Sequence, residues 1–257
     1  MTVTGPDPLQ ADPWHVLRGA TRARVALGRA GDGLPTARLL EFKAAHAAAR
    51  DAVHMPLDAD ALRSSLTAAG VPAARIDGLV EVHSAARDRS TYLQRPDLGG
   101  RLADGTQLPA GECDVAIVVA DGLSPRAVHD HAPGLVVALL ERLDGWTVGP
   151  LVVAAQARVA LGDPVGEALG ARIVVVAIGE RPGLSSADSL GLYLTFGPRP
   201  GRADSERNCL SNVRPPHGLG YAQAADTLVA LLTASRELGA SGVALKDEGP
   251  GLPAGAD

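Results

Sequence analysis

The sequence has few of the residues that would build a cross-linked or metal-rich protein. Only two cysteines occur in 257 residues, Cys113 and Cys209, and no CxxC pair is present. A disulfide framework and a cysteine-based zinc or iron-sulfur site are therefore excluded, and reduced thiols are expected. The seven histidines are scattered, and the closest two, His129 and His131, point to different sides of a helix. We predict no metal site.

Long apolar runs and an excess of positive charge are also missing. No apolar run approaches the roughly 20 residues that a membrane-spanning helix needs, and the segment from Met1 to Trp14 is polar and proline-rich rather than signal-like. The formal net charge is -5, with acidic and basic residues interspersed. This balance gives no electrostatic reason to expect a nucleic-acid partner. We expect a soluble intracellular protein.

The first 110 residues favour helices. Apolar residues make up 46% of the chain and charged residues 21%, which is typical of folded domains. Residues 35–54 repeat apolar side chains at helical spacing, which predicts a helix with one apolar face and one charged face. A second helix is predicted over residues 58–69, before Gly70 and Pro72. The apolar positions of the first helix are Leu39, Phe42, Ala45, Ala49 and Val53.

After residue 110 the pattern changes to alternating strands and helices. Strands are predicted at residues 115–120, 151–155 and 173–178. Helices are predicted at 127–143 and 221–238, and a short helix is predicted to end near Gly170. This alternation predicts an α/β fold: a Rossmann-like, mostly parallel sheet with flanking helices, preceded by a small helical N-terminal region. We expect a helical region over 1–110, a Rossmann-like domain over 111–248 and a flexible tail over 249–257.

Ligands of such a sheet bind beyond the carboxyl ends of its strands, which directs attention to the loops at residues 120–125, 179–188 and 198–212. Glu180 directly follows a predicted strand, between two glycines that allow a ligand to approach the backbone. Its carboxylate is suited to accept hydrogen bonds from amide or hydroxyl donors, and an ion pair with a nearby arginine is the alternative. Cys209, in a predicted loop, is either ligand-facing or a small buried residue.

Several common activities lack their motifs. No GxGxxG follows the first strand and no GxxxxGK[ST] occurs, so nicotinamide and triphosphate cofactors are poorly supported. Asp121, Ser124, His129 and Asp130 suggest acyl or phosphoryl transfer, but no GxSxG elbow is present, and helix capping explains Ser124 better. The spacing alone indicates a ligand-binding α/β protein with an unknown ligand.

Six sequence strings together resemble the small subunit of ethanolamine ammonia-lyase, in their order and their spacing. They are LGRAGDGLPT, HAAARDAVH, TYLQRPDLGGRL, VADGLSPRAVH, AIGERPGLSS and RNCLSNVRP. The resemblance spans roughly residues 14 to 247. It implies a carbon-nitrogen lyase that converts ethanolamine to acetaldehyde and ammonia by radical chemistry started from adenosylcobalamin, a cobalt cofactor.

The resemblance also implies how the work is divided between two subunits. The large subunit holds the ethanolamine, this chain covers part of the cobalamin, and this chain alone is inactive, with no catalytic residue of its own. Carried over to matching positions, the cobalamin contacts are Val159 in ARVALGD, Glu180 in GERPG and Cys209 in RNC. Ser124 and Ser186 are further candidates for polar contacts.

The resemblance implies a cytoplasmic protein and leaves location in a bacterial microcompartment open. Proline and glycine in the short N-terminal extension oppose the amphipathic helix that such targeting would need. Two other functions also stay open. One is a structural or assembly subunit without ligand contact, and the other is a stand-alone nucleotide-binding or hydrolytic α/β enzyme.

Overall fold

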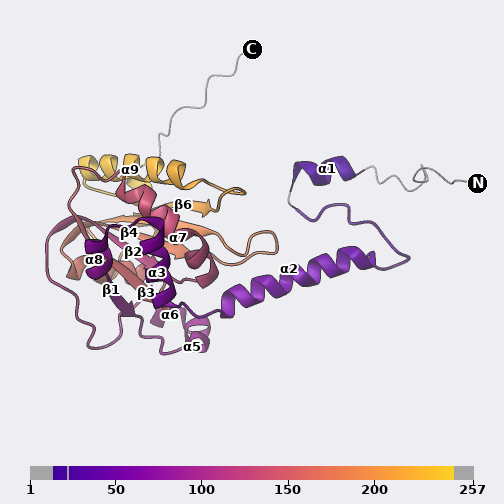
Figure 1. The fold of residues 1–257 in the computed structure, drawn as a ribbon, viewed down its shortest axis with the longest axis horizontal. Coiled ribbons are helices and arrows are strands. Elements are labelled where there is room, and N and C mark those ends of the chain that lie inside the picture. Colours follow the sequence, from indigo (N-terminus) through magenta and orange to yellow (C-terminus); the bar gives the residue numbers. More distant parts are fainter. Residues whose placement is uncertain (1–13, 22, 246–257) are drawn as a thin grey trace, which may run out of the picture.

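A computed structural model describes residues 14–21 and 23–245 of the chain. Its centre is a six-stranded sheet in the order β1-β3-β2-β4-β5-β6, with helices on both faces (Figure 1). The segment from Met1 to Pro13 and the predicted flexible tail, 249–257, lie outside the described residues.

The sheet is mixed. β1, β3, β2 and β4 pair in parallel, whereas β5 is antiparallel to β4 and β6 is antiparallel to β5. The predicted α/β class, with a largely parallel sheet and flanking helices, is confirmed at this level. The strands are β1 (Val80–His83), β2 (Cys113–Ala120), β3 (Val148–Ala155), β4 (Ala171–Gly179), β5 (Leu190–Phe196) and β6 (Arg207–Val213).

Most predicted helices are present near their expected bounds. α2 matches the helix predicted at residues 35–54, and α3 ends at Ala69 with Gly70 as its cap, whose φ of 100° suits glycine. The helices are α1 (His15–Ala20), α2 (Thr36–His54), α3 (Ala59–Ala69), α4 (Ala73–Asp77), α5 (Arg89–Gln94), α6 (Pro96–Gly99), α7 (Pro125–Leu140), α8 (Gly162–Ala168) and α9 (Tyr221–Leu238). Short 3-10 turns are η1 (Val159–Leu161), η2 (Asp204–Glu206) and η3 (Gly242–Ala244).

The sheet buries both of its faces. Because side chains alternate along a strand, Val115, Ile117 and Val119 of β2 pack with α3, α7 and α9, whereas Ala116 and Val118 pack on the opposite side with α8. The chain therefore leaves β2 toward one face, into α7, and leaves β3 toward the other, into α8. Neighbouring strands whose connections part in this way leave a crevice at their carboxyl ends.

The sequence did not predict either edge strand. β1 lies before residue 110, where the sequence predicted helices and no strand, and β6 takes up much of the loop expected at residues 198–212. Both strands are hydrogen-bonded to a neighbour on one side only, so their outward positions are polar and no long apolar run marks them. β1 joins the sheet from before residue 110; the division into domains at that residue stays a prediction.

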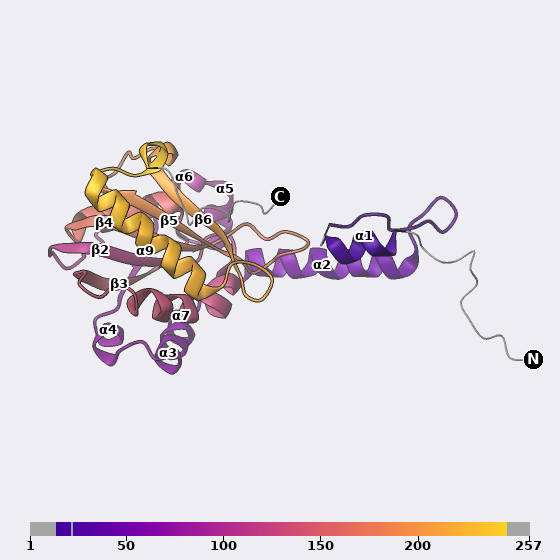
Figure 2. The ribbon, with the colours of Figure 1, turned by 90° about the horizontal axis from the view of Figure 1, so that it is seen from above.

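The N-terminal helices form an arm that projects from the sheet (Figure 1, Figure 2). Both views place α1 toward the far end of α2. Of the predicted apolar face, Val53, near the inner end of α2, is half-buried, whereas Leu39 and Phe42 are exposed. The predicted apolar face of α2 therefore meets the body at its inner end and is largely open farther out. Among the described helices, none is long and apolar enough to cross a membrane.

Candidate functional site

A pocket of about 420 Å³ lies beyond the carboxyl ends of the central strands. Its walls come from the loops that follow β2, β3 and β4, together with side chains of β5 and β6. This is the crevice that the sequence predicted for ligand contact. The loop residues that line it are Gly122, Leu123, Arg158, Val159, Glu180 and Arg181.

Glu180 is held at the pocket by the far strand of the sheet. Its carboxylate accepts a hydrogen bond from Ser211 Oγ and another from the Asn212 backbone N–H at 3.2 Å. Its own N–H donates to the Ser189 carbonyl at 2.9 Å. No arginine pairs with Glu180 in the part of the chain that the structure describes, so the alternative of an ion pair is not seen. A carboxylate with two oxygens keeps acceptor sites for a ligand.

Val159 begins the turn after β3 and is half-buried at the pocket. Asp121 fixes this turn from the end of β2, because its carboxylate accepts from the backbone N–H groups of Gln156 and Ala157 at 2.8 and 2.9 Å. Burial raises the pKa of Asp121, while these amides and Arg89 favour the charged form. Two predicted contact residues, Val159 and Glu180, are therefore brought to one pocket.

Cys209 requires a correction, since it lies on β6 and not in a loop. Its backbone pairs with Tyr193 of β5, and its side chain is exposed. Cys209 does not line the pocket itself, but Tyr193 and Ser211 do. Because Cys209 and Ser211 lie two residues apart on one strand, they share a face. The alternative of a small buried cysteine is wrong, and the thiol stands beside the pocket.

Burial raises the pKa of Tyr193 to about 12, so its hydroxyl stays neutral.

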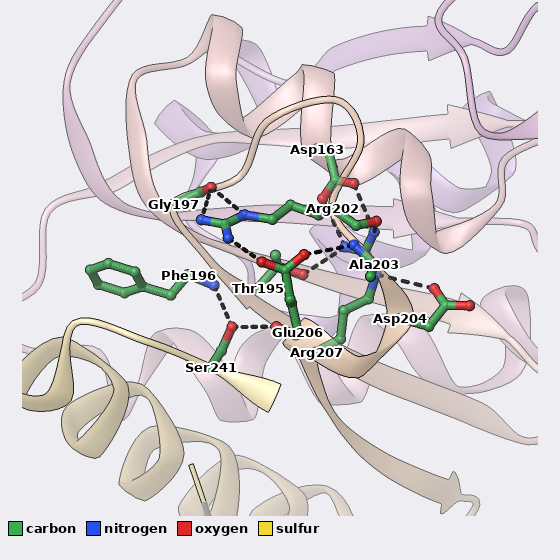
Figure 3. Close-up of polar contacts among 10 residues, drawn as sticks. All are labelled: Asp163, Thr195, Phe196, Gly197, Arg202, Ala203, Asp204, Glu206, Arg207 and Ser241. Carbon is green, nitrogen blue, oxygen red and sulfur yellow. Dashed lines mark hydrogen bonds and ion pairs between the residues drawn. The ribbon is translucent and has the colours of Figure 1, made fainter. Parts of the chain in front are cut away.

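A buried ion pair joins the Val159 turn to the Cys209 strand (Figure 3). Arg207, the first residue of β6, donates two hydrogen bonds to Asp163 of α8, at 2.8 and 2.7 Å. A third goes to Thr195 Oγ1 of β5 at 2.8 Å. Each side chain of the pair is only 2% exposed. The paired fork fixes the start of β6 against the segment that follows Val159.

Tyr92 and Arg158 belong to the site but were not singled out from the sequence. Tyr92 is fully buried, and its hydroxyl donates to the Ala157 carbonyl at 3.0 Å. The Arg158 guanidinium lies 4.4 Å from the centre of its ring, within the range of a cation–π contact. Tyr92 falls inside TYLQRPDLGGRL, one of the six strings that carried the resemblance, and Arg158 falls inside ARVALGD, the match for Val159. Nothing in their spacing, however, signals that residue 92 lies against residue 158.

The two candidate serines lie elsewhere. Ser124 caps α7 by accepting from the Ala127 N–H at 3.2 Å, as predicted, and its hydroxyl donates to the Ala187 carbonyl at 2.8 Å. Ser186 lines a smaller cavity of about 200 Å³ with Asp188 and Arg214. Neither serine lines the larger pocket.

The residues that suggested acyl or phosphoryl transfer are not assembled into a site. His129 accepts a hydrogen bond from the Asp58 backbone N–H at 3.2 Å, and Asp130 pairs with Arg126. Ser124 and Asp121 bind the groups described above. No hydrogen bond joins these four side chains to one another within the described part of the chain. A nucleophile with its base is therefore not formed there.

The family model of the ethanolamine ammonia-lyase light chain (EutC) matches residues 11–246. Three similar proteins are each named ethanolamine ammonia-lyase small subunit. The one from Rhodococcus erythropolis is 53% identical over 237 aligned positions, covering 92% of this chain and 90% of that protein. The one from Ralstonia nicotianae is 52% identical over 262 positions, covering 97% and 94%. The one from Azotobacter vinelandii is 54% identical over 251 positions, covering 94% and 90%.

These matches extend over nearly all of the described residues and confirm the resemblance seen in the sequence. They include the pocket, the buried ion pair and the projecting arm. The chain therefore belongs to the family of ethanolamine ammonia-lyase light chains, also named small subunits.

Proposed function

We propose that this chain is the small subunit of an adenosylcobalamin-dependent ethanolamine ammonia-lyase. With a large subunit it converts ethanolamine to acetaldehyde and ammonia, and on its own it is inactive. Family membership supports the lyase. The observation that carries the cofactor role is the pocket in which Val159 and Glu180 meet at the carboxyl ends of the sheet.

The residues of the pocket fit part of a cobalamin. The rim of a corrin ring carries amide side chains that donate N–H groups, and Glu180 is an acceptor for them. A volume of about 420 Å³ is at the small end of ligand pockets, so it suits one portion of so large a molecule. When bound, adenosylcobalamin supplies the radical with which the conversion of ethanolamine begins.

Each residue of this chain then has a limited task. Glu180, oriented by Ser211 and Asn212, accepts hydrogen bonds and fixes the orientation of the cofactor. Val159 offers an apolar surface that excludes water at the turn after β3. Cys209 packs beside Tyr193 at the edge of the contact. None of them touches ethanolamine in this proposal, because the substrate belongs to the large subunit.

The projecting arm supports the proposed partner. Its exposed side chains include Trp14, Val16, Leu34, Leu40 and Phe42. Apolar side chains gathered on one projecting element favour a protein interface. We assign this arm to docking on the large subunit. The Rossmann-like character of the sheet belongs to the same proposal and is supported by its four parallel strands, β1, β3, β2 and β4. A cytoplasmic location stays a prediction, and the use of a microcompartment stays open.

The test is ammonia release from ethanolamine with added adenosylcobalamin. Three samples are compared: this chain alone, the large subunit from the same genome alone, and the two co-expressed. Activity in the co-expressed sample only is expected. If the pair forms and stays inactive, ethanolamine is the wrong substrate. If no pair forms, the proposed partnership is wrong.

A parallel titration with cobalamin separates the two remaining alternatives. A structural subunit without ligand contact predicts that substitutions at Val159, Glu180 and Cys209 change assembly but not the cobalamin affinity of the assembled pair. A stand-alone nucleotide-binding or hydrolytic enzyme predicts turnover of its substrate by this chain alone.

A further inference from the structure

Arg158 is a pocket cation without an anionic partner. It lines the pocket and is half-buried, yet no carboxylate pairs with it among the described residues. Its Nε is buried and has no hydrogen-bond partner. Arg89, whose guanidinium lies 4.8 Å from the centre of the same tyrosine ring, also has a buried nitrogen without a partner, Nη2, but it has a counter-charge. It pairs with Asp121 and donates to the Val53 and Gly122 carbonyls. Since a half-buried guanidinium without a counter-charge is costly, the site is suited to receive an anion.

The Arg158 side chain is held in one position before any ligand arrives. The Tyr92 ring lies 4.4 Å from the guanidinium, and the Tyr92 hydroxyl is itself fixed to the Ala157 carbonyl. The backbone N–H of Arg158 donates to the Gly99 carbonyl at 2.8 Å, which fixes the main chain from which the side chain extends. A Cβ on Gly99 would come within 2.8 Å of Arg158 Cγ and 2.9 Å of the Tyr92 ring, so this position requires glycine. Such prior ordering lowers the entropy cost of binding.

The geometry of the cation selects the class of ligand. A guanidinium is a planar fork that matches the paired oxygens of a phosphate. Ethanolamine is excluded as its partner because an ammonium group would be repelled. Glu180 stands in the same pocket as the acceptor for neutral N–H donors. The pocket therefore offers Glu180 to amides and the half-buried Arg158 to an anion, with the exposed Arg181 as a second cation at the same pocket.

We propose that Arg158 binds the phosphodiester of the nucleotide loop of cobalamin. This inference rests on the proposed function, since it names the part of the cofactor that the chain recognises. The rim of a cobalamin consists of neutral amides, and its phosphodiester is the one anionic group of that periphery. The Glu180 carboxylate thus accepts hydrogen bonds from the amides of the ligand, and the Arg158 guanidinium binds its phosphate.

The experiment compares two corrinoids that differ only in a phosphate, cobinamide and cobinamide phosphate. Binding to the co-expressed complex is followed by the visible absorbance of the corrin. The wild type is expected to prefer cobinamide phosphate, and Arg158→Gln to lose that preference by about 10- to 100-fold while its affinity for cobinamide changes little. Arg158→Lys restores only part of the preference, because an ammonium lacks the fork. Arg172→Gln, an exposed arginine at the start of β4, serves as the matched control.

The outcomes separate this inference from the function on which it rests. If the wild-type complex shows no preference between the two corrinoids, or if Arg158→Gln weakens both equally, the phosphate contact is wrong. If Arg158→Gln weakens only the association of the two subunits, the anion is a carboxylate of the partner and the inference is overturned. If the active wild-type complex binds no cobalamin, the proposed cofactor role itself fails.

Discussion

Ser211, on β6, donates a hydrogen bond to Glu180, which directly follows β4, although β4 and β6 are not neighbours in the sheet. β5 lies between β4 and β6, yet the Glu180 carboxylate reaches across its end. A bulge makes this possible: Leu192 pairs with Leu210 whereas Leu190 pairs with Val213, and Asn212 adopts a φ of 60°. The extra residue turns the Asn212 N–H toward Glu180. The shape of an edge strand thereby decides the direction of the candidate ligand contact.

Glu180→Ala is expected to weaken cobalamin binding by the assembled complex about 10- to 100-fold, the value of one to two hydrogen bonds to a charged group. Ser211→Ala removes one of the two bonds that orient the carboxylate, so a smaller loss is expected. Equilibrium titration with cobalamin measures both. Glu167→Ala, an exposed glutamate at the end of α8, is the matched control. Unchanged affinity and turnover in Glu180→Ala would refute the assignment.

Asp163→Asn tests the buried ion pair. It keeps the shape of the side chain but removes the buried counter-charge of Arg207, which keeps only the exposed carboxylate of Asp204 at 3.4 Å. A loss of about 3–5 kcal/mol in the free energy of unfolding is expected. Chemical denaturation of the full chain measures it. Asp130→Asn breaks an exposed pair with Arg126 and should cost less than about 0.5 kcal/mol. Equal losses in the two variants would mean that burial does not strengthen the pair with Arg207.

Gly99→Ala is expected to displace the Arg158 side chain, although the two residues lie far apart in the sequence. The added methyl would lie 2.8 Å from Arg158 Cγ, which forces the side chain or the Tyr92 ring to move. A destabilisation of about 1–3 kcal/mol is typical of such overpacking. Gly111→Ala, whose Cβ would lie at an ordinary 3.7 Å from its nearest neighbour, the Leu169 carbonyl oxygen, is the matched control. If Gly99→Ala is as stable as Gly111→Ala, the tight contact at Gly99 does not fix Arg158.

Much of the fold could be predicted because its central strands are apolar on both faces. The runs at residues 115–120 and 173–178 match β2 and β4, and the helix from Tyr221 to Leu238 was expected at those bounds. The edge strands β1 and β6 could not be found in the same way. Their side chains alternate between a packed face and a polar one, and in so short a strand this pattern resembles a loop.

The site was only partly predictable for a related reason. Val159 and Glu180 each follow a strong strand, and parallel strands bring their carboxyl ends together, so topology alone places them near one another. The pairing of Arg207 with Asp163, and of Arg158 with Tyr92, joins residues 44 and 66 positions apart. Such contacts depend on how helices and loops pack against the sheet. No local spacing encodes them.

His131 predicts a pH dependence of stability. Its ring is nearly buried, Nδ1 shares a hydrogen bond with the Tyr221 hydroxyl at 2.8 Å, and Asp188 and Arg214 pair beside it. Burial lowers the pKa of His131 below its usual 6.5, and this outweighs the attraction of Asp188 and Asp130 for the charged ring.

As the pH falls through about 6.5, the unfolded chain therefore takes up a proton that the folded chain does not, and the free energy of unfolding decreases. His131→Asn removes this titration and keeps a polar group near Tyr221. We expect the stability of the wild type relative to this variant to fall between about pH 8 and about pH 5.5. Denaturant titrations of both proteins at the two pH values measure the difference. A relative stability that rises on acidification would mean that Asp188 and Asp130 outweigh burial at this ring, the reverse of the stated sign.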